Sequence, residues 1–267
     1  MSVRSASAPP PGAPRVPPEA VVVVRDLWKS FGEQVALAGV SLTVRRQEIQ
    51  VIMGPSGCGK TVLLKHLVGL LKPDRGDVLV FGRPVHTLPE DELDALRIQI
   101  GVVFQSAALF DSLTVAENVA FPLRRHRRLS EGAVAQQVRD LLALVEMEGA
   151  ERTMPAALSG GMRKRVGIAR ALALEPSIIL YDEPTAGLDP LTARTVDDLI
   201  LRLRTELGTT AVVVTHDLDS AFRLGDHLGV MEAGRLIASG RPQEILESSN
   251  PFVRRFLATR AVEVKPA

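Results

Sequence analysis

A run of eight residues, Gly54-Pro55-Ser56-Gly57-Cys58-Gly59-Lys60-Thr61, matches the pattern G-x-x-x-x-G-K-[ST] at every fixed position. It follows the apolar residues Val51-Ile52-Met53, which predict a strand, and precedes a predicted helix. Glycines let successive backbone N–H groups turn toward one point, and the positive end of the following helix adds to the attraction for an anion. We therefore expect a phosphate-binding loop, in which Lys60 contacts the β- and γ-phosphates of a nucleotide and the Thr61 hydroxyl binds Mg²⁺.

Two carboxylates, Asp182 and Glu183, follow the apolar run Ile178-Ile179-Leu180-Tyr181. Such a run suits a strand buried on both faces, so the carboxylates are expected at its carboxyl end, where α/β proteins bind ligands. Beside a phosphate-binding loop, Asp182 is expected to hold Mg²⁺ and Glu183 to polarise the attacking water. Taken alone, the pair could equally be an exposed acidic turn before Pro184.

A third segment, Leu158-Ser159-Gly160-Gly161-Met162, resembles the signature L-S-G-G-Q of the ATP-binding-cassette (ABC) ATPases, with Met162 in place of the glutamine. A serine hydroxyl and glycine N–H groups at a helix N-terminus form an anion site, although such a segment taken alone is often a simple helix cap. The resemblance implies that Ser159, Gly160 and Gly161 bind the ATP held by a second copy of the chain.

The resemblance to ABC ATPases covers roughly residues 21–258 and implies further roles. Gln105 matches the glutamine that contacts Mg²⁺ and water and communicates with a transmembrane partner. His216 matches the histidine that touches the γ-phosphate, and the segment Pro184-Thr185-Ala186-Gly187-Leu188-Asp189 matches the loop that crosses the dimer interface. Phe31 matches the aromatic that stacks on adenine, but an aromatic at this place could also be a core residue.

Strand and helix patterns alternate along the chain, which predicts an α/β fold. Strands are predicted at residues 21–25, 48–53, 77–81, 101–104, 177–181, 211–215, 229–232 and 235–238. Apolar residues at helical spacing predict helices through residues 62–70, 134–145 and 196–207. We expect the core sheet of a P-loop NTPase of the ABC type, flanked by helices, with an antiparallel β region near the N-terminus and an inserted α-helical subdomain at about 106–175.

Composition limits the class of protein further. The chain has 267 residues, of which 46% are hydrophobic and 24% are charged, as in an ordinary globular protein. A net charge of +1 and 4% aromatic residues argue against a nucleic-acid partner. No apolar run approaches the ~18–20 residues that span a bilayer. Prolines crowd residues 1–20, so we expect a disordered tail there, an ABC ATPase domain over 21–258 and a short tail over 259–267.

Less general segments are similar to the Mla/Mce-type lipid-transport ATPases. These are residues 104–115 and 119–124, the methionine at position 162 and the ending Asn250-Pro251-Phe252-Val253-Arg254-Arg255-Phe256-Leu257. The resemblance implies an ATP-hydrolysing motor subunit that moves phospholipid or another lipid across the cell envelope. Its implied partners are a second copy in a head-to-tail ATP sandwich, a transmembrane permease and an Mce-type lipid-binding protein. The permease would hold it at the cytoplasmic face of the inner membrane.

Three other functions are weighed against lipid transport. An importer ATPase for polar solutes such as amino acids has the same fold and chemistry, and it stays the main alternative. ABC ATPases that act on ribosomes or DNA usually have two cassettes or a long coiled-coil insertion, and this sequence has neither. A P-loop kinase is disfavoured by Ser159-Gly160-Gly161 and by Glu183.

Overall fold

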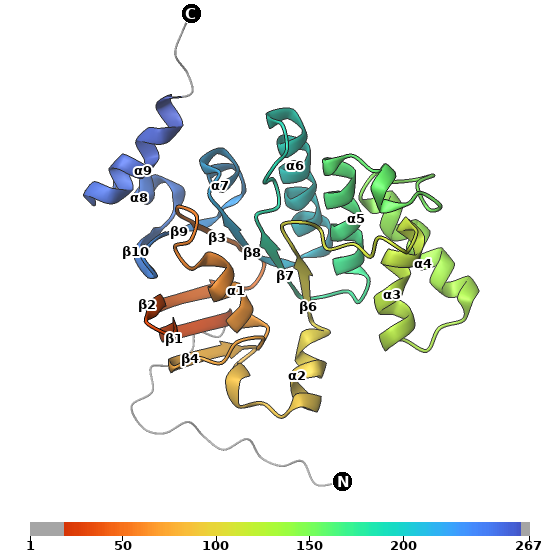
Figure 1. Cartoon of the computed structure of the whole chain (residues 1–267), viewed down its shortest axis with the longest axis horizontal. Coiled ribbons are helices and arrows are strands. Elements are labelled where there is room, and N and C mark those ends of the chain that lie inside the picture. The colour runs from red at the N-terminus through yellow and green to blue at the C-terminus, as the bar shows by residue number, and fades with distance from the viewer. Residues whose placement is uncertain (1–18, 263–267) are drawn as a thin grey trace, which may run out of the picture.

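Two β-sheets and the helices around them make up the described part of the chain, shown as a computed structural model in Figure 1. The structure describes residues 19–262, and the side chains of residues 19–259. The predicted tail of residues 1–20 therefore lies almost entirely outside the described residues, and that of residues 259–267 lies mostly outside them. The domain boundaries inferred from the sequence stay predictions.

The central sheet lies in the middle of the described chain. Its strands are β3 (Ile49–Met53), β6 (Ile100–Val103), β7 (Ile178–Asp182), β8 (Thr210–Thr215), β9 (His227–Glu232) and β10 (Arg235–Gly240). The strand order is β10-β9-β3-β8-β7-β6, with parallel pairing from β9 to β6 and antiparallel pairing of β10 with β9. Every residue of β3, β7 and β8 is buried, as their apolar runs predict for strands covered on both faces.

A second, antiparallel sheet covers one face of the first. It contains β1 (Ala20–Phe31), β2 (Gln34–Arg45), β4 (Arg75–Val80) and β5 (Arg83–Pro84), in the order β2-β1-β4-β5. This sheet confirms the antiparallel region expected near the N-terminus. The sequence did not predict β2, because β2 is an edge strand whose burial does not alternate regularly. Its pairing with β1 contains several register shifts, and Gly39 interrupts the strand.

Nine α-helices and two short 3₁₀ helices, η1 and η2, occupy the described residues. They are α1 (Lys60–Leu67), η1 (Val85–Thr87), α2 (Glu90–Arg97), α3 (Val115–His126), α4 (Glu131–Leu144), η2 (Pro155–Ala157), α5 (Gly160–Leu172), α6 (Pro190–Leu207), α7 (Leu218–Leu224), α8 (Pro242–Leu246) and α9 (Pro251–Val262). The predicted extension of α1 to Leu70 is wrong: the helix ends at Leu67, Gly69 has φ +67°, and Leu70 is exposed.

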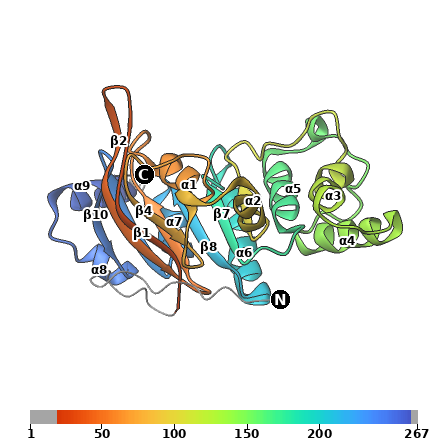
Figure 2. The same ribbon diagram turned by 90° about the horizontal axis from the view of Figure 1, so that it is seen from below.

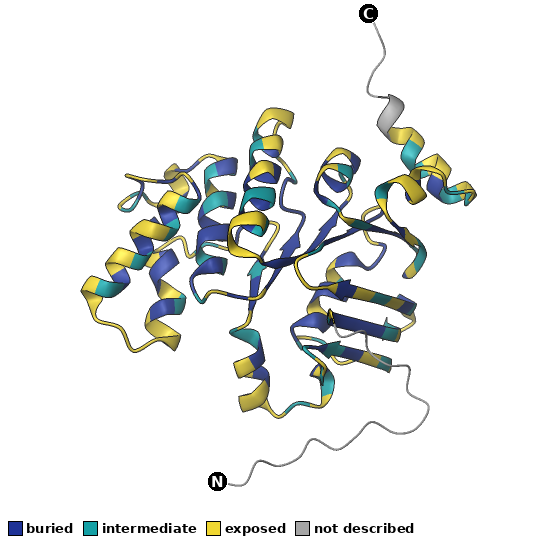
Figure 3. Cartoon of the chain, turned by 180° about the vertical axis from the view of Figure 1, so that it is seen from behind, coloured by how far each residue is buried: buried dark blue, intermediate teal, exposed yellow. Residues whose placement is uncertain are grey.

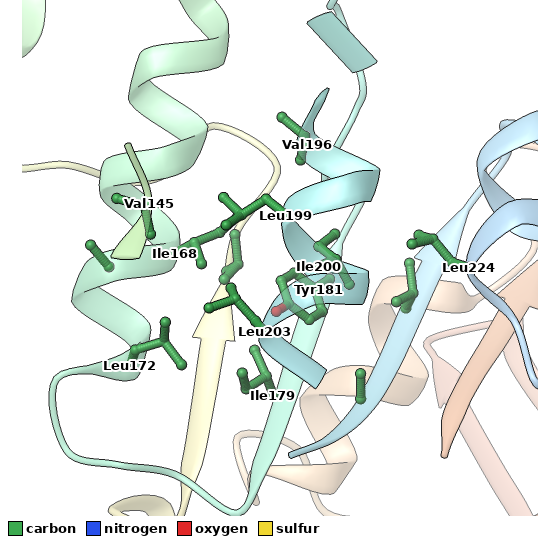
Figure 4. Packing of buried hydrophobic residues seen from close by; sticks show 14 of the residues in the cluster. Val145, Ile168, Leu172, Ile179, Tyr181, Val196, Leu199, Ile200, Leu203 and Leu224 are labelled. Atoms are coloured by element: carbon green, nitrogen blue, oxygen red, sulfur yellow. The ribbon is translucent and has the colours of Figure 1, made fainter. Parts of the chain in front are cut away.

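Alternation along the central strands divides the core into two clusters. Ile179 and Tyr181 of β7 face one side and pack against α5 and α6 (Figure 4). Ile178 and Leu180 face the other side and join the cluster beneath α1 and the antiparallel sheet. Figure 3 shows the result, with buried residues along the strands and exposed residues on the outer faces of the helices. The central sheet is thus covered on both faces.

None of the helices within residues 19–262 combines the length and the apolar character that crossing a membrane requires.

Leu203 of α6 gives a test of this packing, because its side chain is fully buried beside β7 (Figure 4). We expect Leu203→Ala to lower the free energy of unfolding by about 2–5 kcal/mol, since the lost apolar contacts leave a cavity. Urea unfolding measures this loss. The matched control is Leu207→Ala, at the exposed end of the same helix, which should stay within ~0.5 kcal/mol of the wild type. Equal effects of the two substitutions would contradict the packing described.

Candidate active site

The register of the parallel strands brings four segments to one edge of the central sheet. Asp182 pairs with Val214, and Ile52 pairs with the same Val214 from the other side. The residues after β3, β7 and β8 therefore begin at one level. Val103, at the end of β6, is level with Tyr181. This edge is formed by the carboxyl ends of the strands, where ligands bind in parallel α/β sheets.

The predicted phosphate-binding loop joins β3 to α1 at this edge. Gly59 is the N-cap of α1, with φ +107°, and no side chain caps the first turn of the helix. The first N–H groups of α1 are thus available to an anion. A Cβ atom on Gly59 would lie 2.5 Å from the carbonyl oxygen of Ala36, and one on Gly54 would lie 2.3 Å from that of Met231. These approaches require glycine at both places.

The remaining residues of the loop differ in their exposure to solvent. Pro55, Ser56 and Gly57 are exposed at its tip, and a Cβ atom on Gly57 would meet nothing within 4 Å. The Cys58 side chain instead points into the core, and its burial raises the pKa of the thiol although Lys60 opposes this rise. Cys58 can therefore serve a phosphate through its backbone rather than through its sulfur.

Lys60 is buried between the phosphate-binding loop and Glu183, which follows β7. Its Nζ donates hydrogen bonds to the carbonyl oxygens of Gly54 (2.7 Å) and Pro55 (3.1 Å). The same Nζ lies 3.5 Å from Oε1 of Glu183. The amine is thus held inside the curl of the loop, with an opposite charge that offsets the cost of burying it.

Thr61, in the first turn of α1, contacts Asp182, the last residue of β7. The Thr61 hydroxyl donates to Oδ1 of Asp182 at 3.0 Å. Burial raises the pKa of Asp182, and the negative charge of Glu183 raises it further, while the Thr61 hydrogen bond lowers it. A hydroxyl oxygen and a carboxylate oxygen side by side are the hard ligands that Mg²⁺ prefers, and Mg²⁺ commonly takes one or two protein ligands together with substrate phosphates. The donor set therefore fits Mg²⁺.

Glu183 is buried and has contacts on every side. Its Oε2 accepts hydrogen bonds from the backbone N–H of His216 at 3.2 Å and lies 2.9 Å from Nδ1 of the same histidine. Its backbone N–H donates to Val214 of β8 at 2.9 Å, and its backbone has φ +49°. The strained backbone and the fixed carboxylate are typical of a functional position. The structure thus brings Lys60, Glu183 and His216 together.

Lys164 of α5 was missed by the sequence reasoning. Its side chain is buried, and its Nζ donates to the carbonyl oxygens of Gln105 (2.6 Å) and Glu183 (2.9 Å). Burial lowers the pKa of Lys164 to about 8, although the charges of Glu183 and Asp182 oppose the decrease. The spacing in the sequence could have indicated this burial. Lys164 lies four residues before Ile168, and therefore on the same face of the helix as that buried apolar residue.

The signature residues lie at the start of α5. Ser159 is the N-cap, and its Oγ accepts a hydrogen bond from the N–H of Met162 at 3.2 Å. A Cβ atom on Gly161 would lie 2.5 Å from the Thr192 side chain of α6, so glycine is needed there. In Figures 1 and 2, α5 lies beyond β7 as seen from α1. The structure therefore does not bring Ser159, Gly160 and Gly161 together with the phosphate-binding loop of the same chain.

Two predicted residues lie at the surface. Gln105 is exposed just after β6, with its carbonyl oxygen bound to Lys164. Phe31, at the end of β1, is 49% exposed, so the alternative of a core residue is wrong. Nζ of Lys29 lies 5.7 Å from the centre of the Phe31 ring.

A buried polar cluster adjoins the site. Asp197 of α6 accepts a hydrogen bond from the Ser220 hydroxyl of α7 at 2.7 Å, and Ser220 in turn lies 3.3 Å from the Thr185 hydroxyl. These residues line a hollow of about 980 Å³ that Glu183 and His216 also border. Burial raises the pKa of Asp197 to about 6, and the charge of Asp217 acts in the same direction.

The fold and the site define a nucleotide-binding protein of the P-loop class, and the comparisons with known proteins narrow this class. Residues 37–186 match the family model described as ABC transporter. The chain is 41% identical over 241 residues to the probable ribonucleotide transport ATP-binding protein mkl of Mycobacterium tuberculosis, covering 90% of this chain and 67% of that protein. It is 39% identical over 237 residues to the intermembrane phospholipid transport system ATP-binding protein MlaF of Escherichia coli, covering 89% of this chain and 88% of MlaF.

Solved structures agree with the relatives. A dimeric structure of a post-hydrolysis state of an ATP-binding cassette, bound to ADP and Pi, is 36% identical, with a TM-score of 0.76, and covers 83% of this chain and 98% of that chain. The protein cbiO1 of Clostridium perfringens, part of the ABC transporter complex cbiONQ, is 31% identical with a TM-score of 0.79, covering 91% of this chain and 97% of that chain. The chain belongs to the ABC transporter family and is an ABC-type ATPase.

Asp197 gives a pH test of the polar cluster. Its folded pKa lies above the unfolded value of ~3.9, so its contribution to stability is complete below about pH 4 and is lost as the pH rises through about 6. We expect the free energy of unfolding of the wild type to fall over this interval, by up to about 3 kcal/mol from this one group. Asp197→Asn, which keeps the shape without the titration, should show a flatter profile in urea unfolding between pH 4 and 7. Parallel profiles would contradict the assignment.

Proposed function

We propose that this chain is the ATP-hydrolysing motor subunit of a lipid transporter in the cell envelope. The observation that carries the ATPase mechanism is the meeting of Lys60, Thr61, Asp182, Glu183 and His216 at one edge of the central sheet. In this mechanism, the loop amides and Lys60 bind the β- and γ-phosphates. Lys60 exchanges its two carbonyl partners in the loop for phosphate oxygens, which are stronger acceptors because they are charged.

Glu183 is the group that polarises the attacking water in this proposal. Its carboxylate is held by His216 and faces Lys60, so its orientation is set before substrate binds. The His216 side chain is half exposed, so its ring is open to contact with the γ-phosphate in this proposal. Thr61, Asp182 and Gln105 are the residues proposed to hold Mg²⁺, and the ion would neutralise charge on the phosphates.

A second copy of the chain completes the site in the proposed mechanism. Ser159, Gly160 and Gly161 lie away from the loop of their own chain, so a head-to-tail partner is needed to bring such a helix end to the nucleotide. Dimeric cassettes among the solved structures support this arrangement. Phe31, exposed at the end of β1 in the antiparallel sheet, is then proposed to stack on adenine.

Lipid is proposed as the cargo because of the relatives. MlaF is described as part of an intermembrane phospholipid transport system, and a chloroplast protein of Arabidopsis thaliana, trigalactosyldiacylglycerol 3, is 41% identical over 255 residues, covering 89% of this chain and 73% of that protein. The mycobacterial relative carries a name that refers to ribonucleotide transport, so a polar solute is the second candidate. An Mce-type lipid-binding protein is a proposed further partner.

A permease is proposed to dock at an apolar groove beside Gln105. The groove has a volume of about 360 Å³ and is bordered by α2, β6, α3 and α5. Three of its aromatic side chains, Phe104, Phe110 and Phe121, are 41–48% exposed, and the rings of Phe110 and Phe121 are 4.9 Å apart. Exposed aromatics that adjoin one another are typical of an interface with an apolar partner segment. The permease would place the chain at the cytoplasmic face of the inner membrane.

Glu183→Gln tests the catalytic mechanism. The substitution keeps the size of the side chain and removes the base, so we expect ATP hydrolysis to fall at least about a hundredfold while ATP binding is retained. We also expect ATP to trap a dimer, because the closed state can no longer be released by hydrolysis. Steady-state phosphate release and size-exclusion chromatography with ATP measure the two effects. The exposed Glu148→Gln is the control and should hydrolyse as the wild type does. A Glu183→Gln protein with wild-type turnover would refute the role of Glu183.

Purification from native membranes tests the cargo and the groove together. We expect the tagged chain to retain a membrane permease, and mass spectrometry to find phospholipid bound in the complex. Phe104→Ala combined with Phe121→Ala should lose the permease while isolated ATP hydrolysis remains, because these side chains are exposed rather than buried in the core. Recovery of a complex with a soluble solute receptor and no lipid would favour the polar-solute alternative. Undiminished permease recovery with the double variant would contradict docking at the groove.

A further inference from the structure

One cation on α5 reaches two separate parts of the central site. Lys164 donates to the carbonyl oxygen of Gln105, which follows β6, and to that of Glu183, which follows β7. Only 5% of Lys164 is exposed, and the distances of 2.6 and 2.9 Å are those of charge-assisted hydrogen bonds. Burying a long, flexible cation in this way costs side-chain entropy and hydration free energy. The two hydrogen bonds of Lys164 must offset this cost.

Glu183 depends on this contact because its backbone is strained. A φ of +49° in a residue other than glycine is a strained conformation, which persists only where the surrounding structure holds it. The backbone N–H of Glu183 is bound by Val214, and its carbonyl oxygen accepts from Lys164 and from the N–H of Ala186 at 3.2 Å. The conformation that aims the carboxylate at Lys60 and His216 is therefore fixed partly from α5.

The same helix, α5, also holds the segment beside the apolar groove through two further residues. Arg170, six residues after Lys164, donates to the carbonyl oxygens of Ala107 (2.8 Å) and Ala108 (2.7 Å). Between these two cations, Gly167 lies so close to Ala107 that an added Cβ would be 3.2 Å from the Cβ of that alanine. Residues 105–108 thus contact α5 at three positions, Lys164, Gly167 and Arg170, and Lys164 also binds the backbone of Glu183.

We propose that Lys164 is a positioning residue that makes three parts of the protein move as one unit. These parts are α5 with the signature residues at its start, residues 105–108 beside the groove, and the backbone of Glu183. A displacement of α5 or of residues 105–108 changes the geometry around one ammonium group, and this change turns the catalytic carboxylate. Lys164 contacts backbone oxygens and not the substrate, so it acts through Glu183. The proposal rests on the proposed role of Glu183 in ATP hydrolysis.

Kinetics of the full-length chain with ATP and Mg²⁺, without permease, test the proposal. Lys164→Met keeps the length of the side chain and removes every donor, so we expect kcat to fall about tenfold or more while KM for ATP and ATP affinity stay within twofold, because only the orientation of Glu183 changes. Lys164→Gln keeps N–H donors without the charge, and its kcat should lie between those of Lys164→Met and the wild type. The split between kcat and KM separates positioning from a general loss of structure.

The matched control is Arg163→Met on the same helix. Arg163 is exposed, and its guanidinium donates to Leu158 rather than to residue 105 or 183, so kcat should stay within twofold of the wild type. If Lys164→Met does not fold by circular dichroism, Lys164→Ala replaces it with the same expected result. A donor-free variant with kcat within twofold of the wild type overturns the proposal, as does a loss of ATP affinity equal to the loss of kcat. Glu183→Gln in the same series shows separately whether the role of Glu183 holds.

Discussion

Two cations and two carboxylates, Lys60, Lys164, Asp182 and Glu183, are buried together at the carboxyl edge of the central sheet, and the structure of the site depends on this balance of charge. Each group alone would cost several kcal/mol to bury. Lys60 pairs with Glu183, Asp182 accepts from the Thr61 hydroxyl, and both lysines donate to backbone carbonyls, so these contacts offset the cost of burial. The raised pKa of Asp182 and the lowered pKa of Lys164 show that burial still dominates at both groups.

Burying these four charges together requires a particular strand register and cover on both faces of the central sheet. Parallel strands in register must end at one level, so that a loop, an acidic turn and a histidine begin side by side. The apolar faces of β3, β7 and β8 then need cover on both sides, which α5, α6 and α7 provide on one face and α1 with the antiparallel sheet on the other. The central sheet is therefore packed on both faces. The residues proposed to contact nucleotide or a partner lie in the segments that follow its strands.

Sequence patterns predicted the elements that carry strong periodicity and missed those that do not. The strands at 48–53, 177–181 and 211–215 correspond to β3, β7 and β8, because a strand buried on both faces must be apolar throughout. Strand β2 escaped prediction since an irregular edge strand shows no clean alternation. Lys164 escaped because a cation in an amphipathic helix normally faces solvent, and the two carbonyl oxygens that accept from it lie 59 and 19 residues away in the chain.

The sequence by itself determined the chemistry of the protein: a phosphate-binding loop, an acidic pair after a buried strand, and a glycine-rich helix start, each local enough for residue type and spacing to define it. Only the tertiary structure decided which of these groups meet. Thr61 reaches Asp182, Glu183 lies between Lys60 and His216, and Lys164 joins Gln105 to Glu183, whereas the signature residues at the start of α5 lie away from the phosphate-binding loop of the same chain. The physical reason is that strand register and helix packing are long-range constraints, set by burial of the two core clusters rather than by any short stretch of residues.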